Sequence, residues 1–236
     1  MAKKITLLLD AGQLRWALRA ALEAASSDYV TPVLCSVNWI VEGKYVHLFA
    51  TDRYRVHEAL VPRPKGAANG SFMMDREQAQ WILNNSHRPA RSFPNQQIRI
   101  SFTEGVLGKA GRIAVEIFAS VEVDAPVFRY DADAVPGNYP PVHGLFAKTI
   151  AAEGDSAGIV GLNPKFIGSL QCLVGYRGEP IVVTVPKGSE KLSAILVQNV
   201  AGTARALVQP MLLTSNVEWQ GGEIAIPEPV AKAAAA

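Results

Sequence analysis

Three copies of one local pattern constrain the fold of this chain more than any other feature of its sequence. Each copy has a short apolar run, a helix-capping residue, an amphipathic helical stretch and then apolar residues in alternation. Side chains repeat every two residues in a strand and about every 3.6 in a helix, so each change of period marks a new element. We therefore expect an α+β fold in which repeated strand-helix-three-strand motifs place helices on one face of antiparallel sheets.

A helix start signal stands near the beginning of each copy. Asp10, Asp75 and Asn163 each follow a short apolar run, and their side-chain oxygens can accept hydrogen bonds from the first helical amides. In the first two copies a glutamine stands three residues later, as in a capping box. In the third, a proline occupies the first helical position, where its missing N–H costs nothing. Helices are expected at about residues 11–25, 76–86 and 164–174.

Alternating apolar and polar residues predict the strands around each helix. Opening strands are expected at residues 5–9, 71–74 and 159–162, and later strands at 33–41, 44–50, 55–61, 98–103, 113–123, 180–186, 191–198 and 204–213. The resulting units are a two-motif domain over 1–129 (motifs at 1–66 and 67–129), a Pro, Gly and Asp-rich connector over 130–158, a third motif over 159–213, and a tail over 214–236. We expect the tail to be mobile.

Composition indicates a globular protein of the cytoplasm. The 236 residues are 49% hydrophobic and 19% charged, which is enough apolar material to bury a sizeable core. We expect no membrane span and no signal peptide, because no apolar run is long enough. Cys35 and Cys172 lie in separate apolar stretches without a CxxC pattern, so we expect free thiols rather than a disulfide or a metal site.

Signatures of catalysis are missing from the sequence. It has no phosphate-binding glycine loop, no nucleophile elbow and no zinc-binding HExxH helix. Its four histidines have no regular spacing to a serine, a cysteine or a carboxylate pair. We therefore expect no catalytic residue, no cofactor and no metal, and a protein that is not an enzyme.

Three segments resemble motifs of the bacterial DNA polymerase III beta subunit, the DNA sliding clamp family. Residues 48–56 (LFATDRYRV) resemble the family turn Ala-Thr-Asp-Gly-x-Arg-Leu, and 137–142 (GNYPPV) resemble its linker Gly-x-Phe-Pro-x-Tyr. Residues 208–213 (VQPMLL) resemble its terminal Met-Pro-Met-Arg-Leu. Arg53 stands where the family has glycine, and Leu212 stands where it has arginine. The resemblance runs over about residues 5–213 and is to the middle domain and the last half-domain of the family's clamp, so it implies that this chain is a shortened variant.

This resemblance implies a ring with helices inside and continuous sheet outside. Such a ring encircles double-stranded DNA and tethers a DNA polymerase, and it also binds the clamp loader through linear peptide motifs. The resemblance also implies a hydrophobic peptide-binding pocket made of Leu34, Thr51, Arg55, Val56, Pro140, Leu145, Leu207, Val208, Pro210, Met211 and Leu213.

Charge is consistent with sliding along DNA rather than gripping it. The formal net charge is only +2, whereas tight phosphate binding needs a strong basic excess. Polar residues opposite or beyond the apolar helix stripes are candidates to face DNA, with ordinary solvated helix faces as the alternative. These DNA-facing candidates are Arg15, Arg19, Gln80, Arg88, Arg91 and Lys165.

Assembly follows from counting motifs. Rings of this family contain twelve motifs, and this chain carries three, so four copies would supply the full number. We expect a homotetramer of dihedral symmetry, in which third motif pairs with third motif and first with first about two-fold axes. Two alternatives remain: a monomeric decoy or regulator that binds clamp-binding peptides without encircling DNA, and a small α+β enzyme with a deep polar pocket.

Overall fold

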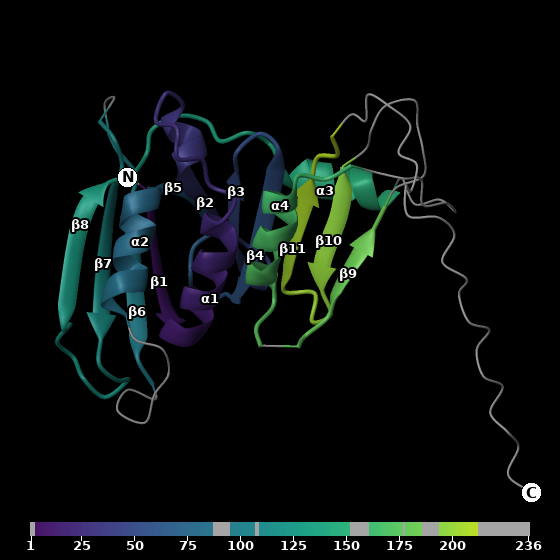
Figure 1. Cartoon of the computed structure of the whole chain (residues 1–236). Helices are drawn as coiled ribbons and strands as arrows, with labels where there is room; N and C mark the ends of the chain where they lie inside the picture. Colours follow the sequence, from purple (N-terminus) through teal and green to yellow (C-terminus); the bar gives the residue numbers. More distant parts are fainter. Residues whose placement is uncertain are drawn as a thin grey trace, which may run out of the picture.

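The computed structural model describes residues 3–86, 95–106, 109–151, 161–176, 178–185 and 194–211. Their strands form two antiparallel sheets, in the orders β1-β6-β7-β8 and β5-β2-β3-β4-β11-β10-β9. Helices α1, α2 and α4 lie on one side of the strands (Figure 1). No helix among the described residues is long and apolar enough to cross a membrane.

The first two motifs exchange their opening strands. β1 (Lys4–Asp10) leads into α1 (Ala11–Leu22), yet it pairs with β6 (Gln97–Thr103) of the second motif. Conversely, β5 (Gly70–Asp75) leads into α2 (Arg76–Asn85) and pairs with β2 (Ser36–Glu42) of the first. Each sheet therefore contains a strand of the other motif, so the two motifs cannot separate without breaking both sheets.

The third motif adds to the sheet of the first motif, although the second precedes it in sequence. β4 (Arg55–Pro62), the last strand of the first motif, pairs with β11 (Ala204–Val208), the last strand of the third. β4 is thus an interior strand, so its edge is not available for the expected pairing of first motif with first motif. The outer edges of the two sheets are β8 (Phe128–Asp133) and β9 (Ile181–Thr184).

The remaining elements complete each motif. They are η1 (Pro32–Cys35), β3 (Tyr45–Thr51), β7 (Arg112–Phe118), α3 (His143–Ala151), α4 (Pro164–Ser169), η2 (Leu170–Leu173) and β10 (Ile195–Asn199). Of the predicted opening strand at 159–162, Gly161 forms an isolated bridge with Met211, and residues 159 and 160 lie outside the described residues. The predicted tail lies outside them as well.

The three helix caps are confirmed. The Asp10 carboxylate accepts a hydrogen bond from the Gln13 amide at 2.8 Å, and Asp75 and Gln78 form a full capping box. Asn163 Oδ1 accepts from the Lys165 amide at 3.0 Å. These predictions succeed because capping depends on residues close in sequence.

Several predicted boundaries are wrong. The strands expected at 113–123 and 204–213 end at Phe118 and Val208, and the helix expected at 11–25 ends at Leu22. The strand expected from residue 33 begins only at Ser36, because Pro32 opens a 3-10 turn, where its fixed φ fits and its missing N–H costs nothing. The connector expected from residue 130 begins after Asp133, because β8 completes the four-stranded sheet. The connector also contains a helix of its own, α3.

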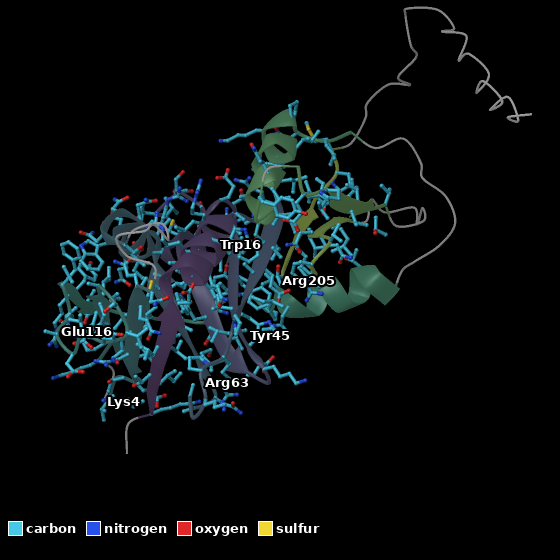
Figure 2. The ribbon with its side chains drawn as sticks, turned by 90° about the horizontal axis from the view of Figure 1, so that it is seen from below. Lys4, Trp16, Tyr45, Arg63, Glu116 and Arg205 are labelled. Atoms are coloured by element: carbon cyan, nitrogen blue, oxygen red, sulfur yellow. The ribbon has the colours of Figure 1, made fainter. Side chains whose placement is uncertain are left out.

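Two apolar clusters lie on opposite faces of the seven-stranded sheet. The main core is on the helix side and includes Leu14, Trp39 and Leu48. On the other face, α3 packs over a smaller set, here called the outer-face cluster, made of Phe49, Val56, Val142, Phe146, Leu196 and Leu207. Figure 2 shows Arg205 beside α3 and Trp16 on α1, with strands of the sheet between them.

Candidate nucleic-acid groove and peptide site

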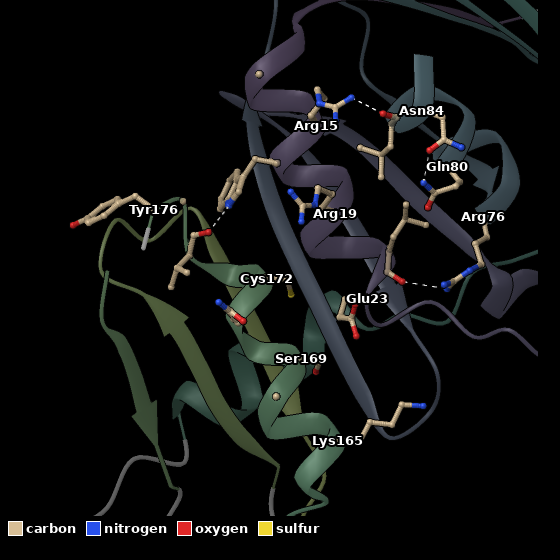
Figure 3. A pocket seen from close by; sticks show the side chains of 18 residues that line it. Arg15, Arg19, Glu23, Arg76, Gln80, Asn84, Lys165, Ser169, Cys172 and Tyr176 are labelled. Atoms are coloured by element: carbon tan, nitrogen blue, oxygen red, sulfur yellow. Dashed lines mark hydrogen bonds between the residues drawn. The ribbon is translucent and has the colours of Figure 1, made fainter. Parts of the chain in front are cut away.

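A broad open groove runs along the helix side of the molecule between α1, α2 and the α4-η2 segment (Figure 3). Its volume is about 1240 Å³, and its lining is more polar than apolar. Four of the six predicted DNA-facing residues line it, namely Arg15, Arg19, Gln80 and Lys165. The other two, Arg88 and Arg91, lie outside the described residues.

Arg15 and Arg76 bind helix α1 to helix α2 reciprocally. Arg15 Nη1 donates to the Leu83 carbonyl at 2.5 Å, and also to the Ser86 carbonyl, at the end of α2. Arg76 Nη1 donates to the Ala25 carbonyl at 2.9 Å, just after the end of α1. Carbonyls at helix ends lack intrahelical partners, so each arginine caps the neighbouring helix.

This capping corrects one expectation. Arg15 was expected on a solvent-facing helix surface, but it is half-buried and its guanidinium is engaged by α2. Helical periodicity predicts correctly that Arg15 lies opposite the apolar stripe of α1. It could not predict that α2 lies against that face of α1. Arg15 therefore contributes its charge to the groove from a fixed position and not as a mobile side chain.

Arg19 and Lys165 are the cations best placed to meet a phosphate. Both are exposed, and neither side chain forms a hydrogen bond or ion pair with the rest of the described chain. They come from helices on either side of the groove, α1 and α4 (Figure 3). Glu23 also lines the groove, so its charge is mixed, with an excess of positive side chains.

Arg55 joins the first motif to the third and lies away from the predicted peptide pocket. It is buried, and its guanidinium donates to Asp52 Oδ2 at 3.0 Å and to Ser169 Oγ at 2.6 Å. It also lies 4.9 Å from the centroid of the Phe166 ring. Neighbouring strand residues point to opposite faces, so Arg55 faces the helices while Val56 faces outward.

Cys172, which lines the groove, contacts the buried His57, and both side chains are held neutral. His57 Nδ1 donates to the Ala20 carbonyl at 2.8 Å, and burial lowers the pKa of His57 to about 4. Cys172 Sγ lies 3.6 Å from the same ring nitrogen, and burial raises the pKa of Cys172 to about 12. A thiolate nucleophile is therefore not available at neutral pH. The described residues contain no cluster of three or more potential metal ligands.

The structure brings together one part of the predicted peptide pocket. Thr51, Val56 and Leu207 are cross-strand neighbours in register, and Val56 and Leu207 belong to the outer-face cluster. Pro140 and Leu145 lie on the connector segment that covers this cluster, and Leu145 is 43% exposed.

The remaining predicted pocket residues are dispersed. Val208 faces the helix side and belongs to the main core, and Leu34 is buried in η1. Pro210 is buried, whereas its neighbour Met211 is 53% exposed. Leu213 lies outside the described residues.

Sequence reasoning missed Phe146, which fills the outer-face cluster. Its side chain is fully buried, with its ring centroid 6.5 Å from that of Phe49. A signal was present: residues 48–50 (LFA) are consecutively apolar, as expected for a strand buried on both faces. Something had to cover the second face, and α3 does so.

A polar cluster that was also missed lies beside Phe146. The buried Glu58 carboxylate is 2.7 Å from His47 Nδ1 and accepts a hydrogen bond from Arg205, whose guanidinium lies 4.2 Å from the Phe146 ring centroid. Burial raises the pKa of Glu58, but hydrogen bonds from His47 and Arg205 outweigh it and hold the pKa below its usual value. The cluster borders a hollow of about 180 Å³ between β3, β4, β10 and β11.

Comparison with known proteins supports the fold. No family model matches the sequence, and no curated protein matches it. Among solved structures, the chain is similar to the structure of a candidate DNA polymerase III beta subunit from Eubacterium rectale, with a TM-score of 0.58. The match covers 92% of this chain, and the two sequences are 9% identical. The chain spans 66% of that protein's length. At this identity the likeness concerns the fold alone: the chain has a clamp-like fold.

Proposed function

We propose that the chain is a subunit of a DNA sliding clamp, a ring without enzymatic activity that encircles duplex DNA and tethers a polymerase. The observation that carries this proposal is the groove, where Arg15, Arg19, Arg76 and Lys165 line the helix side of a clamp-like fold. In the proposed ring, that side forms the inner wall and the two sheets form the outer wall.

Weak phosphate contact suits this role. A closed ring cannot leave circular DNA sideways, so retention comes from topology, and strong neutralisation of phosphates would slow sliding. A net charge of +2 and only two exposed, unpaired cations described in the groove, Arg19 and Lys165, match that requirement.

The proposed ring is a homotetramer. The first two motifs form one domain by exchanging their opening strands, whereas the third motif exchanges no strand with another motif among the described residues. It exposes apolar side chains that a mate would cover: Ile167 on α4 is 51% exposed, and Val183 on the edge strand β9 is 52% exposed. Pairing third motif with third motif across a two-fold axis would complete a second domain.

Polymerase and loader peptides are proposed to bind beside the outer-face cluster. Leu145, on the segment that covers the cluster, and Met211, just beyond the end of β11, are exposed apolar side chains suitable for contact with a short linear motif. Phe146 fills the centre of the cluster, so the peptide would bind at the margin unless α3 moves.

The experiment reverses the two exposed groove cations. An Arg19→Glu/Lys165→Glu variant should be lost from nicked circular DNA faster than the wild type and show a flatter salt dependence. The matched control is Lys4→Glu/Lys44→Glu, which reverses two exposed cations away from the groove. Equal retention of both variants would contradict the assignment of the groove to DNA, and a wild-type monomer that binds peptides but not circular DNA would indicate a decoy instead.

A further inference from the structure

The four-stranded sheet ends in β8, whose equivalents in the other two motifs pair with each other and join those motifs. β8 is the last strand of the second motif, and its outer side has no partner strand among the described residues. The last strands of the other two motifs, β4 and β11, pair with each other in antiparallel fashion and join two motifs into one sheet. The edge of β8 is thus the equivalent of an edge already used for motif-to-motif joining in this chain.

Backbone geometry defines which groups β8 offers to a partner. The Ala134 amide donates to the Gly111 carbonyl of the neighbouring segment at 2.7 Å, so Ala134 points inward. In an antiparallel ladder alternate residues point to alternate sides, so Arg129, Asp131 and Asp133 present their N–H and C=O groups to the free edge. The alternation ends at Val127, just before β8, whose amide donates inward to the Ile117 carbonyl at 2.7 Å.

Side-chain charge then selects one register for self-pairing. Two antiparallel copies of one strand are related by a two-fold axis. Because the odd-numbered residues of β8 present their backbone groups to the free edge, each must lie opposite an odd-numbered residue of the partner to form hydrogen bonds. An axis at Tyr130 places Arg129 opposite the partner's Asp131, twice. An axis at Asp131 places Asp131 opposite itself, and an axis at Arg129 places two arginines together. Only the Tyr130 axis pairs opposite charges without opposing like ones.

The faces of β8 agree with this register. Arg129 and Asp131 lie on the solvent side of the sheet and are exposed. Tyr130 lies on the helix side, where its ring stacks on Trp81 of α2 with centroids 5.0 Å apart. Phe128 is 39% exposed on the same side and would meet the partner's Ala132.

We infer that β8 of one copy pairs with β8 of a second copy about a two-fold axis at Tyr130, which makes one continuous eight-stranded sheet from two four-stranded sheets. This seam supplies one of the two contacts that the proposed ring needs. It concerns assembly alone, so it can hold even if the groove does not bind DNA.

The first experiment uses charge reversal on β8, read as molar mass by light scattering. Asp131→Arg places arginines opposite each other twice and should weaken association on the order of tenfold or more, halving the mass at micromolar concentration. Arg129→Glu/Asp131→Arg restores opposite pairs and should restore the mass. Asp133 pairs with Arg112 of β7 at 2.9 Å, so the matched control Asp133→Arg/Arg112→Asp exchanges the two charges and keeps that pair. In the Tyr130 register residue 133 faces Val127, and this control should leave the mass unchanged.

The second experiment tests the axis itself with Tyr130→Cys. Facing residues on a two-fold axis between antiparallel strands have Cα atoms roughly 4.5–5.5 Å apart, within disulfide range. Mild oxidation should convert this variant to covalent dimers, while the wild type, with free Cys35 buried and Cys172 half-buried, should not cross-link. A monomeric wild type, a loss of mass in Asp133→Arg/Arg112→Asp, or a folded Tyr130→Cys protein that stays uncross-linked would each overturn the inferred seam.

Discussion

At the scale of single residues, three arginines on the helix side connect elements within the chain. Arg15 and Arg76 cap each other's helices, and Arg55 links α4 to β4. Arg15 and Arg76 satisfy helix-end carbonyls, and a buried carbonyl left without a donor costs more free energy than an ordinary hydrogen bond gains. Only Arg19 and Lys165 are left with exposed, unpaired charge in the described part of the groove.

Removal of Arg15 should therefore affect stability as well as DNA binding. We expect Arg15→Ala to lower the free energy of unfolding by about 1–3 kcal/mol, because the Leu83 and Ser86 carbonyls lose their donor. Arg19→Ala on the same helix should change it by less than about 0.5 kcal/mol. Urea unfolding of both variants provides the measurement, and equal effects would argue against the capping role.

His57 should make the protein less stable in mild acid. Its pKa is about 4 in the folded chain against 6.5 as the ordinary value, so between these pH values the unfolded chain binds a proton that the folded chain does not. The free energy of unfolding should therefore decrease as the pH is lowered through that window, by about 2–3 kcal/mol from pH 7 to pH 4.5. His57→Gln should lose this component, and parallel pH profiles for the two proteins would rule the explanation out.

At the scale of elements, short-range features were predictable from sequence and long-range ones were not. Asp10 and Asp75 identified their helices because a cap and its amides are a few residues apart. Nothing near Arg15 in sequence shows that the end of α2 lies against it, because that contact spans 68 residues. The same reason hid Phe146, which reaches Phe49 only once the connector has folded back over the sheet.

The outer-face cluster separates two kinds of peptide-site variant. Leu207 is buried beneath α3, so Leu207→Ala should destabilise the fold by about 2–5 kcal/mol. Met211 is exposed, so Met211→Ala should leave stability nearly unchanged while weakening a clamp-binding peptide by about 1–3 kcal/mol. Calorimetric titration of a labelled peptide would test the second expectation, and unchanged affinity would exclude Met211 from the site.

At the scale of the whole molecule, the order of motifs in space differs from their order in sequence. The third motif lies beside the first, through β4 and β11, which leaves β8 and β9 as the two outer edges. Sequence could supply the number of motifs but not their neighbours, because strand pairing between distant segments leaves no local pattern. In the proposed ring, copies would be joined alternately by β8 and by the third motif, and a total of twelve motifs would require four copies.

Topological retention on DNA tests the central claim most directly. Subunits dissociated by dilution would be mixed with nicked circular plasmid, concentrated to reassemble, and passed through a sizing column in high salt. We expect assemblies of about four times the 25.3 kDa chain mass to travel with the circle and to be released when a single restriction cut linearises it. Retention that survives linearisation, or no retention on the circle at all, would contradict the account of a ring that encircles DNA.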